Sequence, residues 1–463
     1  MLQLGKDEQK CWRHTSFAQD EDGAILPLTI ILFLVLVGTL GLGVDIMRHE
    51  MIRAEMQDSL DRGLLAAADL DQTLDPELTV KEYFRTAKWA GSAVTPTVRI
   101  NENTIRSRRI SAQATGSFKT SFMKLAGVSK LGLTASAVAQ ERRKNLEISL
   151  VLDISGTMRW CENNSSNCPD GNRIEKLIPA AQQFIDRLLD DTNADYTSIS
   201  IIPYAGQVNP GTHLFETVGG VRSYEHYGNS CTELQTIDFT YSGLPARGSY
   251  DQVPHFHNWN IDNTWMEWGW CPSDDVAITP MSNDATELKT AIEKLRYNLH
   301  DGTGTNNAMK WALALLDPTS NTALQPLIED EDFLDRPDAF NASETLKFIV
   351  LMTDGQITGQ IRPTDPWNEE NATRELRRQG SDAYETATGT GTAVKQFEAM
   401  CDMARDNGVV VYTIAYLAPS KAQLQMRECA YKQATHFYNI QDLDVSYAFN
   451  DIITTINKIK LVR

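Results

Sequence analysis

Oxygen-bearing side chains follow three segments in the C-terminal part of the 463-residue chain. The run LEISLVLDIS (146–155) leads into a D-x-S-x-T motif, and the run LKFIVLMTDG (346–355) ends in T-D-G. Between them, DGTGT (301–305) precedes a helical pattern. Carboxylates and hydroxyls are hard oxygen donors, which suit Mg²⁺ in octahedral coordination. The residues expected to form a metal site are Asp153, Ser155, Thr157, Thr303 and Asp354.

Elements that alternate along the chain from Leu146 onward must position these side chains. Apolar runs predict strands over 146–155, 197–205, 346–355 and 408–417, and periodic apolar residues predict helices over 174–188, 284–297, 306–316, 390–407 and 443–459. Strands that alternate with helices predict an α/β fold with a mainly parallel, doubly wound sheet. Such sheets gather functional loops at the carboxyl ends of their strands, where the three motifs would meet.

The order of these motifs resembles the metal-ion-dependent adhesion site of von Willebrand factor A domains. The resemblance implies such a domain over 146–463. It implies that Ser155, Thr157 and Thr303 bind the ion directly, whereas the two aspartates act mostly through water or as supporting groups. The last motif position is usually Ser in that family, and Thr157 keeps its oxygen. Thr305 is a possible substitute for Thr303.

The resemblance also implies the identity of the ion and its use. Mg²⁺ is expected, with Mn²⁺ or Ca²⁺ as alternatives. Because few negative charges touch the ion, it stays electrophilic, and a carboxylate from a partner protein can complete its coordination shell.

An uncharged run near the N-terminus predicts a membrane anchor. Gly23–Val44 reads GAILPLTIILFLVLVGTLGLGV, 22 residues without a charge. As a helix it reaches about 33 Å, enough for a hydrocarbon core of about 30 Å. A cleaved secretory signal is the alternative, but its apolar region is normally only about 7–15 residues long. Residues 1–22 would then form a short arm on one side of the membrane.

Cysteine positions indicate which side that is, since basic residues are balanced around the run. Cys11 precedes the run and six cysteines follow it. An even set suits an oxidising compartment, so the arm is placed in the cytosol and the large C-terminal part outside. Sequence proximity favours three disulfides, although other pairings and a set of buried thiols remain open. The favoured pairs are Cys161–Cys168, Cys231–Cys271 and Cys401–Cys429.

Two further regions depart from the α/β pattern, one before it and one within it. In residues 45–145, helical spacing continues to about residue 70, and alternating runs such as RISAQATG (109–116) then predict a small β-rich module. Residues 207–283 lack the α/β rhythm and are interpreted as an inserted subdomain, pinned by Cys231–Cys271. The tryptophans expected in its core are Trp259, Trp265, Trp268 and Trp270.

Several functions are excluded or disfavoured. The formal charge of −18, with no basic stripe, argues against nucleic-acid binding. A phosphatase-like enzyme with Asp153 as nucleophile would need a second acidic pair, but the later motif is T-D-G-Q with one acid. The pair His255 and His257 lacks an evident third zinc ligand. We therefore expect neither catalysis nor a small-molecule substrate.

A second resemblance covers nearly the whole chain. The motifs Phe17…Asp22-Gly23, Val44-Asp45 and MQDSLDRGLLAAA (56–68) are similar to those of TadE/TadG-type tight-adherence (Flp) pilus assembly proteins, most like the TadG type. The stretch 268–318 and the pair Cys401…Cys429 around GVVVYTIAYL are similar too.

This resemblance implies a single-pass protein of the bacterial inner membrane whose von Willebrand domain lies in the periplasm. It implies partners among other pilus assembly proteins, such as pseudopilins and pilus or outer-membrane components. A metal-independent structural brace or envelope adhesin is the alternative.

Overall fold

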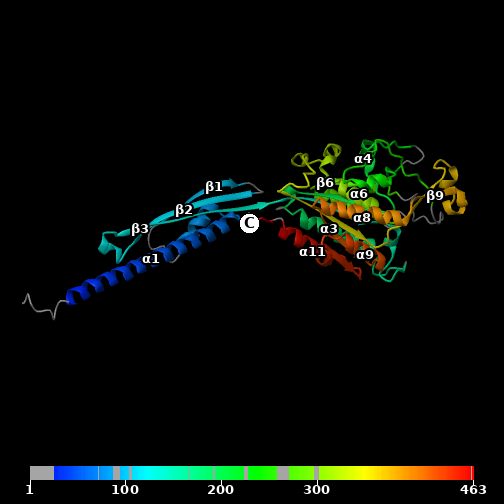
Figure 1. The fold of residues 1–463 in the computed structure, drawn as a ribbon. Coiled ribbons are helices and arrows are strands. Elements are labelled where there is room, and N and C mark those ends of the chain that lie inside the picture. The colour runs from blue at the N-terminus through cyan, green and yellow to red at the C-terminus, as the bar shows by residue number, and fades with distance from the viewer. Residues whose placement is uncertain are drawn as a thin grey trace, which may run out of the picture. The chain divides into compact units, whose positions relative to one another are not determined.

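The computed structural model divides the chain into two compact units, residues 1–142 and residues 143–462. It describes residues 25–70, 72–86, 94–103, 107–165, 167–190, 193–223, 228–257, 271–296, 302–459 and 461–462. Cys11 and the four tryptophans expected in the insertion lie outside the described residues. Figure 1 shows the elements of both units.

One long helix, α1 (Ile25–Ala68), runs through the first unit. It is the one helix among the described residues that is long and apolar enough to cross a membrane, and the side chains of its apolar half are exposed. A second helix, α2 (Pro76–Arg85), begins where Asp75 accepts a hydrogen bond from the backbone N–H of Leu78. Pro76 suits the first helical position, where no intrahelical N–H bond is lost.

An antiparallel sheet packs on the second half of α1. Strands β1 (Thr97–Asn103), β2 (Ser107–Lys119) and β3 (Lys130–Arg143) are neighbours in it, in chain order. Alternate residues of β2, such as Ile110 and Ala114, are buried with Leu60 and Leu64 of α1. The first unit thus combines a helix that continues to Ala68 with a β-sheet that packs on it.

A six-stranded sheet in the order β11-β10-β7-β4-β5-β6 organises the second unit. Its strands are β4 (Asn145–Asp153), β5 (Thr197–Tyr204), β6 (Thr279–Ser282), β7 (Thr345–Thr353), β10 (Val410–Tyr416) and β11 (Phe437–Ile440). All neighbouring pairs are parallel except β5 with β6. This confirms the predicted mainly parallel sheet. Strand β6 falls within the expected insertion, yet it forms an edge of the main sheet.

Helices cover both faces of this sheet. One hydrophobic core joins Leu150 and Leu152 of β4 to α3 (Arg173–Leu188), α5 (Ala285–Glu293) and α11 (Ser446–Ile459). The other joins Val151 of β4 to α6 (Thr305–Ala314), α8 (Thr390–Asp406) and α9 (Ser420–Cys429). Successive side chains of a strand point to opposite faces, so a strand buried on both faces is continuously apolar.

Shorter elements complete the unit. They are α4 (Gly211–Thr217), α7 (Asn321–Leu324), α10 (Gln433–His436), the ribbon of β8 (Gln360–Pro363) with β9 (Tyr384–Thr388), and β12 (Leu461–Val462). Phe256 is buried with Ile361 and Leu376. The described residues hold no cluster of three or more His, Cys, Asp or Glu side chains, so no zinc site is found around His255 and His257 there.

Three disulfides tie the second unit together. They are Cys161–Cys168, Cys231–Cys271 and Cys401–Cys429, with sequence separations of 7, 40 and 28 residues. The pairing that sequence proximity favours is confirmed. The Cys401–Cys429 bridge joins α8 to the end of α9, and the Cys161–Cys168 bridge closes the loop that follows β4.

Candidate metal-binding site

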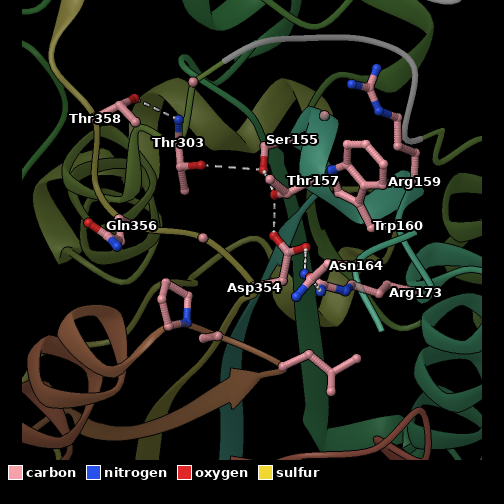
Figure 2. A pocket seen from close by; sticks show the side chains of 16 residues that line it. Ser155, Thr157, Arg159, Trp160, Asn164, Arg173, Thr303, Asp354, Gln356 and Thr358 are labelled. Atoms are coloured by element: carbon pink, nitrogen blue, oxygen red, sulfur yellow. Dashed lines mark hydrogen bonds and ion pairs between the residues drawn. The ribbon is translucent and has the colours of Figure 1, made fainter. Parts of the chain in front are cut away.

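Three loops meet at the carboxyl ends of β4 and β7, two neighbouring strands. The first follows β4 and includes the 3-10 helix η3 (Gly156–Arg159), the second leads into α6, and the third follows β7. Figure 2 shows side chains from all three loops around one pocket, with dashed lines joining their polar atoms. The sheet topology therefore brings together residues nearly 200 positions apart, such as Thr157 and Asp354.

Hydroxyl groups form the centre of this site. Ser155 Oγ lies 3.2 Å from Thr157 Oγ1 and 3.3 Å from Thr303 Oγ1. The Thr157 hydroxyl donates a hydrogen bond of 2.6 Å to Asp354 Oδ1. Ser155 and Thr303 are almost completely buried, whereas Thr157 lies exposed at the pocket rim. Four oxygen donors thus converge on one point from three separate loops.

Asp153 lies behind these hydroxyls and holds their loop. Its Oδ1 accepts a 2.8 Å hydrogen bond from the backbone N–H of Ser155, and its Oδ2 accepts a 2.6 Å bond from the Thr353 hydroxyl. Complete burial and the nearby Asp354 carboxylate raise the pKa of Asp153 to about 7. Because both carboxylate oxygens are already engaged within the protein, the geometry suits a supporting role.

Asp354 has a cationic partner that the sequence reasoning missed. Arg173 Nη1 lies 2.7 Å from Asp354 Oδ2, and the two side chains are 3% and 0% exposed. Burial raises the pKa of Asp354, while Arg173 and the Thr157 hydroxyl oppose that rise. One signal was available in the sequence. Arg173 is the first residue of α3, where a cation opposes the helix dipole and an anionic partner is expected.

A disulfide-closed loop holds Arg173 from its other side. Arg173 Nη2 donates a hydrogen bond to Asn164 Oδ1, and Asn164 lies between Cys161 and Cys168. Asn164 has a positive φ of 58°, a conformation that asparagine tolerates better than most residues. The loop therefore holds the guanidinium against Asp354 in the wall of the pocket.

Glycines allow the loops to approach one another closely. A Cβ on Gly355 would lie 2.8 Å from Thr303 Oγ1, and one on Gly304 would lie 2.0 Å from the carbonyl oxygen of Gly206. The backbone N–H of Thr303 also donates to Thr358 Oγ1 at 2.9 Å. Thr305, the possible substitute, begins α6 with its side chain buried.

The donor set fits a hard cation. In an octahedron with metal–oxygen bonds of about 2.0–2.1 Å, adjacent oxygens are about 2.9 Å apart, whereas Ca²⁺ bonds of about 2.3–2.6 Å would require about 3.3–3.7 Å. The three oxygen–oxygen distances in this site are 3.2, 3.3 and 2.6 Å. Their chemistry suits a hard divalent cation, and their spacing does not select between Mg²⁺ and Ca²⁺.

The pocket beside these donors is large, and both polar and apolar residues line it. Its volume is about 720 Å³, and the carboxyl-end loop of β10 contributes Leu417 and Pro419 to its wall. On another side, the Arg159 guanidinium lies 4.9 Å from the centre of the Trp160 ring.

Comparison with known families and structures gives one match in the first unit. Residues 23–70 match the family model described as "Putative Flp pilus-assembly TadE/G-like". The match covers the predicted membrane segment and all of α1. No curated protein matches the sequence.

Solved structures with similar arrangements were also found. The pilus adhesin SpaC from Lactobacillus rhamnosus GG is 12% identical, with a TM-score of 0.35 over 80% of this chain and 35% of that chain. The PilB minor pilin from Streptococcus sanguinis is 11% identical, with a TM-score of 0.36 over 80% and 79%. The SpRpn10 VWA domain is 9% identical, with a TM-score of 0.30 over 66% and 94%. This chain spans about a third of the length of SpaC. These similarities are too low to carry an argument about function.

Proposed function

We propose that this chain is a membrane-anchored pilus assembly protein of the tight-adherence (Flp) type that binds partner proteins through a Mg²⁺-dependent site. The observation that carries the binding function is the convergence of the Ser155, Thr157 and Thr303 hydroxyls beside Asp354 in the lining of one pocket. The match of residues 23–70 to a TadE/G-like family model supports the pilus role.

The proposed location rests on α1 and the disulfides. The apolar first half of α1 is long enough to span the inner membrane. Three disulfides in the second unit suit the oxidising periplasm and support a cytosolic location for the N-terminal arm. The second unit, as a von Willebrand factor A domain, would then meet pilus components outside the inner membrane.

Each residue of the site has a distinct part in the proposed binding. Ser155, Thr157 and Thr303 would hold the ion, while Asp153 fixes the backbone N–H of Ser155. A bound Mg²⁺ would supply an electrophilic centre for a carboxylate oxygen of the partner. Catalysis through Asp153 is disfavoured, because its carboxylate is completely buried and both oxygens accept hydrogen bonds.

A metal-independent brace or adhesin is the second candidate. It is favoured by one observation, namely that Arg173 already neutralises Asp354 without a metal ion. In that case, partners would bind the pocket walls or another surface, and chelation of divalent cations would leave binding unchanged.

Capture of pilus components by the full chain tests the proposal. Detergent-solubilised protein would serve as bait on envelope extract with Mg²⁺ or with EDTA. Ser155→Ala is the test variant, since it removes the central hydroxyl, and Ser381→Ala is the matched control at an exposed serine of the same unit. Asp354→Ala is a poorer choice because it would leave the Arg173 guanidinium buried without its carboxylate.

We expect a pilus component to bind the unmodified and Ser381→Ala baits in Mg²⁺ only. Equal capture with EDTA would contradict metal-dependent binding and favour the brace. Equal capture by Ser155→Ala in Mg²⁺ would show that recognition lies elsewhere.

A further inference from the structure

The turn between β2 and β3 is attached to α1 at the end of its apolar run. This turn, residues 120–129, contains the 3-10 helix η2 (Met123–Ala126) and is called the hairpin tip below. Buried Asp45 accepts hydrogen bonds from three successive backbone N–H groups of the tip, at 3.0, 2.7 and 2.7 Å. One charged side chain of α1 therefore caps the start of η2.

Close packing reinforces this attachment one turn earlier in α1. A Cβ on Gly41 would lie only 2.5 Å from ring atoms of Phe122, so glycine lets the ring rest directly on the helix backbone. Gly41 belongs to the uncharged run that ends at Val44, and Asp45 is the first charge after it. The hairpin tip thus lies beside the last turn of the predicted membrane segment.

Other contacts between the hairpin and α1 hold the tip beside this part of the helix. Arg108 Nη1 donates to the carbonyl oxygen of Asp69 at 2.6 Å near the far end of α1. His49 Nε2 lies 2.8 Å from the carbonyl oxygen of Gly132, just beyond the tip. Figure 1 shows β2 and β3 running beside α1, with their cyan turn next to the blue helix.

The surface of the tip combines exposed apolar side chains with lysines. Leu125 is 85% exposed, and Phe122 and Val128 are 38% and 39% exposed. The sequence has no Asp or Glu from residue 107 to residue 140. Within the described residues, none of the tip's surrounding lysines has a carboxylate partner. Those lysines are Lys119, Lys124 and Lys130.

Exposed apolar side chains next to lysines are typical of protein segments that lie at a membrane interface. Apolar side chains gain free energy by leaving water for the acyl boundary, at about 25 cal/mol per Å² buried. Lysines extend their charged ends toward anionic phosphates while their stems stay apolar. If the tip lay in water, the 85% exposed side chain of Leu125 would contribute no free energy of burial.

We propose that the hairpin tip inserts into the interface of the same bilayer that α1 spans, with Phe122 and Leu125 on the acyl chains and the lysines on anionic phospholipid headgroups. The inference rests on the proposed anchoring by α1. A second attachment point beside the helix would stop α1 from rotating about its own axis, and it would fix which face of the first unit is turned toward the membrane.

A fluorescent label at position 125 tests this in the full chain. Leu125→Cys in a Cys11→Ser background leaves one free thiol, because the other six cysteines are paired. The variant would be labelled with the environment-sensitive fluorophore NBD and reconstituted into phosphatidylethanolamine–phosphatidylglycerol vesicles, with or without lipid that carries a shallow nitroxide quencher. Leu74→Cys is the matched control, since Leu74 is 65% exposed in the same unit, six residues beyond the end of α1.

The expected result is a blue-shifted emission at position 125 and loss of most of its fluorescence with the quenching lipid, with neither effect at position 74. Vesicle flotation of each sample reports anchoring separately. A floating protein with an unquenched label at position 125 would overturn the inference and leave the anchor intact. Equal quenching at both positions would overturn it as well, because the whole unit would then lie on the membrane. Failure to float would overturn the anchor and, with it, the inference.

Discussion

Arg173 Nη1 and Asp354 Oδ2 are 2.7 Å apart and almost completely shielded from solvent. This ion pair joins the start of α3 to the loop after β7, and it lies directly behind the hydroxyls of the candidate metal site. Asp354 therefore has one oxygen on Arg173 and the other on Thr157. A cation in the site would share this carboxylate with the guanidinium, so the two positive charges are expected to oppose one another.

Replacing Arg173 tests that opposition. In EDTA, Arg173→Met should lower the free energy of unfolding by about 3 kcal/mol, because it leaves the Asp354 carboxylate buried without its partner. Added Mg²⁺ should then stabilise the variant more than the unmodified protein. Urea unfolding of the full chain in detergent measures both effects. Arg187→Met, at an exposed position of the same helix, is the control and should change stability by less than about 0.5 kcal/mol. An equal Mg²⁺ effect in the Arg173→Met and unmodified proteins would contradict the competition.

Magnesium itself should stabilise the second unit. A ligand that binds only the folded state adds about 2.7 kcal/mol at one hundred times its dissociation constant. We expect the midpoint of thermal unfolding to rise with Mg²⁺ and to fall again with EDTA. Ser155→Ala should abolish this response, and the exposed Ser381→Ala should keep it. A Ser155→Ala protein that still responds to Mg²⁺ would show that the ion binds elsewhere.

Lys310, which does not line the pocket of the candidate metal site, should make stability depend on pH. It is completely buried on α6, and its Nζ donates to the carbonyl oxygen of Tyr241 at 2.6 Å. Burial lowers the pKa of Lys310 from 10.5 to about 7, although Asp238 and Asp317 oppose the shift. Between these two pKa values the unfolded chain binds more protons than the folded one, so the free energy of unfolding should rise as pH rises.

The expected rise from pH 7 to pH 10 is a few kcal/mol, at about 1.4 kcal/mol for each pKa unit. Lys310→Met should remove this rise in the free energy of unfolding, because methionine binds no proton in either the folded or the unfolded chain. Lys395→Met, at an exposed position on α8, is the control and should leave the rise intact. Urea unfolding at several pH values measures the slope, and an unchanged slope in Lys310→Met would contradict the assignment to Lys310.

Removal of disulfides should cost stability in the order of loop length. The Cys401–Cys429 bridge closes 28 residues and the Cys161–Cys168 bridge closes 7. Chain-entropy arguments predict losses of about 4 and about 2 kcal/mol on replacing each pair with alanines. Unfolding in urea compares the two double variants, and mass mapping without reductant checks the pairing. The reverse order would indicate that strain or local contacts, rather than loop closure, determine the loss.

Local patterns in the sequence determined a large part of the fold. The uncharged run 23–44, the alternating residues of β2 and the apolar runs of β4 and β7 each carry their own periodicity, which depends only on near neighbours. The three disulfides followed from proximity along the chain. The order of the D-x-S-x-T, Thr and T-D-G motifs was sufficient to select the residues whose hydroxyls and carboxylates lie together.

Only the tertiary structure decided the partners of these residues. Arg173 and Asp354 are 181 positions apart, and Asp45 and Ser121 are 76 apart, so no local pattern relates either pair. The short strand β6 lacks a strong apolar run, and its place at the edge of the sheet depends on β5. In each case the outcome depends on which charges and backbone groups become buried together, since burial makes an unpaired polar group costly and therefore selects its partner.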